Sequence, residues 1–176
     1  MVRLKGSAVA MQDATPRPVK VSDKIQRGDV LSTSRSARLE VEMLDDAIMT
    51  LGEKTIFIVI DYIIGNEPIA ALRLFQGAFS AISGKMMQTA AAKFTVETEI
   101  ATIGIRGIKF WGGVIDGAFQ VAMLEGKTVI IENKTGRVVI DKVNNRTLIK
   151  DANAAPPKPK AWGGNKLDRA IATVAF

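Results

Sequence analysis

The chain has 176 residues, of which 47% are apolar and 24% charged, and 24 Lys and Arg against 18 Asp and Glu give a formal charge of +6. This length suits a single domain, and the apolar fraction excludes a disordered chain. The sequence contains neither His nor Cys, which excludes imidazole acid–base chemistry, Cys nucleophiles, disulfides and the usual zinc or iron–sulfur sites. Only carboxylates, Lys, Tyr and hydroxyl groups remain for catalysis, so a carboxylate-based hydrolase is the last of the alternatives. We expect no enzymatic activity, no metal and no cofactor.

The apolar residues are mainly β-branched. Val and Ile together number 34 against 10 Leu, and there are 12 Thr. Such side chains are stiff at χ1 and fit a pleated surface better than a helix. From Arg3 to Ile149, short apolar segments alternate with turn residues at spacings of about 8–12 residues. The pattern predicts an all-β fold: a sandwich, a barrel or a β-solenoid.

The first clear hairpin signal covers residues 38–51. Leu39, Val41 and Met43 alternate with charged residues, as expected for a strand with one wet face. Asp45–Asp46 suits a tight turn, and residues 47–51 form the predicted return strand.

The segment Ile56–Ile60 is apolar on both faces. The interpretation that we favour is a central strand covered on both sides within the chain. In the alternative, a second copy of the chain covers one face, because uncovered β-rich apolar segments aggregate. Ile56, Ile58 and Ile60 are then candidates for an oligomer interface.

Further along the chain, Phe94–Thr98 alternates in the same manner as the first hairpin. Residues 128–131 and 137–140 flank the turn-rich sequence Asn133–Gly136. This arrangement predicts another hairpin.

The C-terminal part differs in composition, so that residues 1–150 are predicted to form the β domain. Residues 151–164 contain three prolines and are predicted to run as an extended linker. Residues 165–176 are predicted to form a short helix whose apolar stripe is Leu167, Ala170, Ile171 and Val174. A helix this short is marginal alone, so it docks on its own domain or on a neighbour. In the second case Leu167, Ile171 and Val174 belong to an oligomer interface.

Three residues near the middle of the chain are candidates for binding. Lys109 is the basic residue beside Phe110–Trp111 and belongs to the stacking hypothesis for Trp111. Arg106 lies between glycines, and its guanidinium could hold an anionic ligand. The competing interpretation is a structural Arg paired with Glu97 or Glu99. Trp111 could offer a stacking platform to a cell-wall glycan, or it could close one end of the core.

Other ligands have less support in the sequence. The pI of about 9.7 reflects a diffuse excess of cations without a basic helix, so a nucleic-acid partner is not expected. Glu97 and Glu99 share a strand face, but two carboxylates fall short of the six to eight oxygens that Ca²⁺ takes.

These segments together resemble the FecR domain of bacterial cell-envelope proteins. The most specific stretch is Phe94–Thr98 followed by Ala101–Phe110, which is similar to the family's Phe-x-Val-x-Thr and Val-Arg-Gly-Thr-x-Phe signature. The sequence departs from the family at Asp46, Glu99 and Ile108, where Gly, Pro and Thr are usual. The matching segments follow in the expected order: residues 28–33, 37–41, 45–47, 51–55, 77–79, 94–98, 101–110 and 124–129.

The resemblance implies two packed sheets with solenoid-like winding and a place in the periplasm or otherwise outside the cytoplasm. Met1–Val2 runs directly into a strand-like segment, so we expect that a signal peptide was removed. The anti-sigma region and membrane helix of the name-giving members are not expected in this chain. The predicted function is a non-catalytic interaction domain that binds a protein partner, with envelope signalling as the expected context. The alternatives are a self-assembling structural protein and a glycan-binding module.

Overall fold

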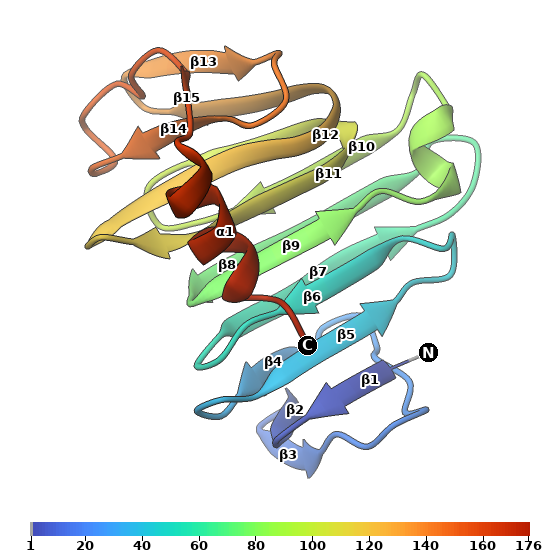
Figure 1. The fold of residues 1–176 in the computed structure, drawn as a ribbon. Coiled ribbons are helices and arrows are strands. Elements are labelled where there is room, and N and C mark those ends of the chain that lie inside the picture. The colour runs from blue at the N-terminus through green and yellow to red at the C-terminus, as the bar shows by residue number, and fades with distance from the viewer. Residues whose placement is uncertain (1) are drawn as a thin grey trace.

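The computed structural model describes residues 2–176, and within them the side chains of all but Val2, Gly107 and Ile108. Strands hold 53% of the residues and helices 8%, which confirms the predicted all-β class with a short C-terminal helix. The strands are hydrogen-bonded into one large sheet. This sheet folds over on itself, so that two layers lie one behind the other (Figure 1).

We call the layer nearer the viewer in Figure 1 the front layer and the other the back layer. The front layer contains β1 (Val2–Lys5), β5 (Arg38–Glu42), β6 (Ile48–Leu51), β9 (Ala78–Ile82), β14 (Asn145–Ile149) and β15 (Lys160–Ala161). The back layer contains β3 (Thr15–Pro18), β2 (Ala8–Gln12), β4 (Val30–Thr33), β7 (Ile56–Ile63), β8 (Ile69–Gln76), β10 (Lys93–Glu97) and β13 (Gly136–Ile140).

The long hairpin of β11 (Thr102–Ile115) and β12 (Ala118–Asn133) joins the layers. The first part of β11 pairs with β10 in the back layer, and residues 109–113 pair with β9 in the front layer. The register between β11 and β12 shifts at Arg106, Gly107 and Lys109. The hairpin therefore changes layer at three successive register shifts, and β-bulges of this kind bend a strand locally.

The core lies between the two layers and contains four phenylalanine rings. Phe57 and Phe94 come from the back layer, and Phe79 and Phe110 come from the front layer. The ring centroids of Phe57 and Phe79 are 5.5 Å apart, and those of Phe79 and Phe110 are 5.2 Å apart. Contacts of this kind contribute beyond the apolar area that they bury, so the aromatic residues fix how the layers face each other.

The sequence predicted the main hairpins correctly. β5 and β6 flank the turn at Asp45–Asp46, β10 covers the alternating segment, and β12 and β13 form the hairpin around Asn133–Gly136.

Residues 151–159 have no strand or helix, and the Thr147 hydroxyl donates to the Pro157 carbonyl at 2.7 Å.

A second, smaller core lies on the outer side of the front layer. Here helix α1 (Gly164–Ala172) covers Trp111, whose ring centroid is 5.5 Å from that of Trp162. The helix therefore lies on its own chain, in front of β9 and β11 (Figure 1). Ala170 and Val174 face the sheet and are buried, whereas Ile171 is 41% exposed.

Polar contacts hold the C-terminal segment in place. The Trp111 indole donates to the Thr173 hydroxyl at 3.0 Å, and the Arg38 guanidinium donates to the carbonyls of Ala172 and Ala175 at 3.2 Å. A Cβ on Gly52 would come within 2.6 Å of the Thr173 carbonyl oxygen, so only glycine lets this segment approach so closely.

Candidate interaction surfaces

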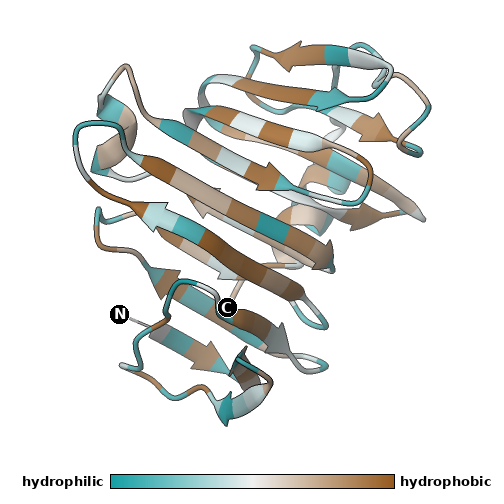
Figure 2. Cartoon of the chain, turned by 180° about the vertical axis from the view of Figure 1, so that it is seen from behind, coloured by the Kyte–Doolittle hydropathy of each residue, from teal (hydrophilic) through white to brown (hydrophobic). Residues whose placement is uncertain are grey.

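The outer face of the back layer is uncovered. Figure 2 views this side, and no helix of the described residues 2–176 lies over its strands. Met11 of β2, Val30 of β4 and Ile58 of β7 are register neighbours and form an apolar row across three strands. Met11 is 39% exposed, and Val30 and Ile58 are half-buried. Scattered apolar side chains are normal on a surface, but a continuous row is typical of a contact site.

The favoured interpretation of Ile56–Ile60 is therefore wrong for one face. Phe57 and Val59 point into the core and are buried, but Ile56 and Ile58 are only half-buried and Ile60 is 36% exposed. The reason is tertiary, because α1, the one α-helix of the described residues, lies on the front layer. Coverage by a second molecule remains a prediction.

An ion pair continues the apolar row. Arg73 of β8 is the register neighbour of Ile58, and Glu97 of β10 is the register neighbour of Arg73. The Arg73 Nε lies 3.0 Å from the Glu97 Oε2. An exposed pair of this kind adds little stability, but it gives the face a polar border with charges of both signs.

The free edge of the back layer at β3 is unsuited to pairing with a further strand. β3 is the last strand of the back layer and contains Pro16 and Pro18. Proline has no N–H to donate and blocks an edge. Arg17 of this strand forms a bidentate pair with the buried carboxylate of Asp29, at 2.8 and 2.5 Å, which holds the strand in place. The face is thus a better contact site than this edge.

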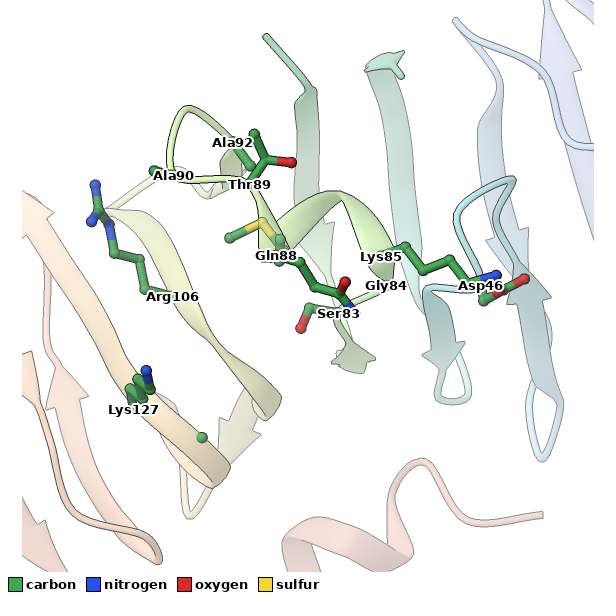
Figure 3. Close-up of a pocket in the computed structure, with 12 residues that line it drawn as sticks. Asp46, Ser83, Gly84, Lys85, Gln88, Thr89, Ala90, Ala92, Arg106 and Lys127 are labelled. Atoms are coloured by element: carbon green, nitrogen blue, oxygen red, sulfur yellow. Dashed lines mark ion pairs between the residues drawn. The ribbon is translucent and has the colours of Figure 1, made fainter. Parts of the chain in front are cut away.

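A groove of about 730 Å³ opens where the two layers diverge. The 3₁₀-helix η1 (Lys85–Gln88) forms one wall as it connects β9 to β10, and Arg106 and Lys127 lie at the opposite side (Figure 3). The other lining residues are Asp46, Ser83, Gly84, Thr89, Ala90, Ala92 and Gly126.

The buried carboxylate of Asp45 anchors the η1 wall. It accepts hydrogen bonds from the backbone N–H groups of Ala47 and Met86 at 3.3 and 3.2 Å, and from the Tyr62 hydroxyl. A Cβ on Gly84 would collide with the Asp45 carbonyl and carboxylate. Burial raises the pKa of the Tyr62 hydroxyl, and the hydrogen bond to Asp45 raises it further. Asp45 therefore ties together the β5–β6 turn, β7 and η1.

The three candidate binding residues of the sequence do not share one site. Arg106 is exposed at the groove. The expected structural partner Glu97 pairs with Arg73 instead. Lys109 lies opposite Glu125 in the β11–β12 ladder. Trp111 is 0% exposed, so a sugar ring has no open face of this indole to stack on.

Lys127 was missed by sequence reasoning. The β11–β12 register passes from Arg106 opposite Thr128 to Gly107 opposite Gly126, which leaves Lys127 unopposed. It is the extra residue of a β-bulge, and a bulge redirects a side chain. The only hint in the sequence is the preceding Gly126, which has a φ of 119°.

Comparison with known proteins identifies the family. The profile described as FecR protein matches residues 29–128, more than half of the chain. The chain belongs to the FecR family. No curated protein matches this FecR-family chain. Within the described residues, neither helix is long and apolar enough to cross a membrane.

Solved structures share the fold of this FecR-family protein. A crystal structure of a candidate anti-sigma factor from Parabacteroides distasonis superimposes with a TM-score of 0.65 at 14% identity, over 81% of this chain and 64% of that one. A second crystal structure of a candidate anti-sigma factor from the same organism gives 0.64 at 14% identity, over 81% and 63%. The chain thus spans less than two thirds of either protein. At this identity the similarity concerns the fold.

Proposed function

We propose that this FecR-family domain is a non-catalytic module of envelope signalling that binds a protein partner. The contact surface is the outer face of the back layer, centred on Ile58. The observation that carries the proposal is the difference in covering: α1 buries the outer apolar residues of the front layer, and no described element does so for the row of Met11, Val30 and Ile58.

The family supports the signalling part of the proposal. The chain belongs to the FecR family, and the similar solved structures come from candidate anti-sigma factors. A periplasmic or otherwise exported location fits this assignment. The surface supports the partner part, because an apolar centre with a charged border is the usual composition of a protein contact site.

The test compares two substitutions of exposed or half-exposed apolar residues by Lys. Immobilised wild-type protein is incubated with native envelope extract, alongside Ile58→Lys and the control Leu44→Lys, which alters a turn residue that is 88% exposed. Wild type and Leu44→Lys should retain the same partner, and Ile58→Lys should lose it. Equal retention by all three would show that the face is not the contact site.

A second candidate function is self-assembly through the same face. Its apolar row and its border with charges of both signs also suit pairing with an identical surface. Light scattering over a range of concentrations tests this candidate, with Ile56, Ile58 and Ile60 as the expected contact residues. A wild-type chain that stays monomeric at every concentration would contradict it.

A further inference from the structure

We propose that the groove beside η1 binds an acidic peptide segment, with Arg106 and Lys127 each taking a carboxylate. This inference rests on the proposed function and names the chemistry of one part of the partner. The groove lies between η1 and the strands that carry Arg106 and Lys127 (Figure 3), whereas Ile58 lies at the end of the apolar row of the back layer, next to Arg73.

The charges that line the groove are not balanced. Its three cations are Lys85, Arg106 and Lys127, and its one carboxylate is Asp46. The Lys85 ammonium lies 2.5 Å from the Asp46 carboxylate. Among the described side chains, no carboxylate forms an ion pair with Arg106 or Lys127. The groove therefore presents two uncompensated positive charges to a ligand.

The backbone brings these two charges to the same place. Arg106 lies opposite Thr128 in the ladder, and Lys127 is the adjacent, unopposed residue of the bulge. Both line one groove only because the bulge interrupts the alternation of side chains along β12. Arginine offers a rigid fork that matches a carboxylate, and lysine adds a compact charge on a flexible stem.

The shape of the groove fits a segment of chain better than an enclosed small molecule. It is partly open to solvent and has both apolar and polar lining residues, with Met87 and Ala92 beside Gln88 and Thr89. The hydrogen bond from the Met86 N–H to the Asp45 carboxylate holds the η1 wall in place before any ligand binds. A wall that is already ordered lowers the entropic cost of binding.

The direct test measures the affinity of a short, labelled Glu-rich peptide by fluorescence anisotropy. The control peptide has Gln in place of every Glu. Two double variants carry the same loss of charge: Arg106→Gln with Lys127→Gln in the groove, and Arg35→Gln with Lys20→Gln at exposed positions elsewhere.

Wild type and the Arg35/Lys20 variant should bind the Glu peptide with affinities within about twofold of each other. The groove variant should bind at least about tenfold more weakly, since it loses the charge-assisted hydrogen bonds of both cations, which are stronger than hydrogen bonds between neutral groups. The Gln peptide should not bind to any of the proteins. An equal loss in both double variants would overturn the inference, because the attraction would then follow net charge alone.

Two further measurements distinguish a peptide from a small anion, and the groove from the contact face. Inorganic phosphate that displaces the peptide at equal concentration would overturn the peptide assignment in favour of a small-anion site. Ile58→Lys should bind the peptide as wild type does. If the Glu peptide fails to bind while Ile58→Lys loses the envelope partner, the groove inference fails and the proposed function stands. If the peptide binds as expected while Ile58→Lys keeps the envelope partner, the proposed contact face fails and the groove remains a peptide site.

Discussion

The two outer faces of this folded sheet both carry apolar side chains, but their surroundings differ. Trp111 on the front layer and Ile58 on the back layer both occupy strands inside the sheet order. Trp111 is 0% exposed under α1, whereas Ile58 remains half-exposed. The strands themselves do not decide this difference. It depends on where the C-terminal segment of the chain lies.

The covering helix is held by its environment. Nine residues are too few for a stable isolated helix in water, so α1 depends on the apolar surface below it and on the polar contacts of Arg38, Trp111 and Asp116. Asp116 binds Lys166 at 2.9 Å and Arg169 at 2.8 Å. One outer face is therefore buried under α1 and stabilises the domain, whereas no described element covers the other.

The largest expected effect concerns the covered face. Trp111→Ala should lower the free energy of unfolding by about 3–5 kcal/mol, because it removes a buried ring and leaves a cavity under α1. Urea denaturation measures the loss. Val114→Ala on the same strand is the control, and it should have little effect because Val114 is 54% exposed. A similar loss of unfolding free energy in both variants would show that the buried Trp111 matters no more to stability than the exposed Val114.

The next effect concerns the junction of the two layers. Asp45→Ala should lower the free energy of unfolding by about 2–3 kcal/mol, because it leaves the buried N–H group of Met86 and the Tyr62 hydroxyl without their acceptor. The neighbouring Asp46→Ala should change it far less, since the Asp46 side chain is 58% exposed. Equal losses in urea denaturation would show that Asp45 does not hold the layers together.

A smaller effect on the free energy of unfolding should depend on pH. The pKa of Tyr62 is raised in the folded protein, mainly by burial and then by Asp45. In the unfolded chain the Tyr62 hydroxyl has a pKa of about 10. The contribution of Tyr62 to the free energy of unfolding is therefore complete below that pH, and it declines above it by up to about 1.4 kcal/mol per pH unit.

Tyr62 is the only tyrosine, so ultraviolet absorbance of the phenolate reports on it alone. The folded protein should show no phenolate signal at a pH where the urea-unfolded chain has titrated. Tyr62→Phe should remove this part of the alkaline loss of stability. A normal titration curve in the folded state would contradict the buried environment.

The smallest effect is expected on the uncovered face. Ile58→Lys should change the free energy of unfolding by less than about 1 kcal/mol, because the side chain is half-exposed and can keep its charge in water. Urea denaturation at low protein concentration provides the measurement. A loss as large as that of Trp111→Ala would mean that another element covers Ile58, and it would end the comparison between the faces.

The site was less predictable than the fold. Arg106 was found because flanking glycines mark it, but Lys127 depends on a register shift between two strands that are defined only when they pair. The same holds for Asp45: its place in a turn follows from the adjacent Asp46, whereas its contacts with Tyr62 and Met86 join segments far apart in the chain.

The sequence alone determined the all-β class, the hairpins and the FecR resemblance, because alternation and turn residues act over a few neighbouring positions. Only the tertiary structure decided which outer face is covered, that Trp111 is buried, and that Arg106 and Lys127 meet at one groove. These outcomes depend on how distant segments pack and on where a strand slips its register, and neither is encoded in any short stretch of residues.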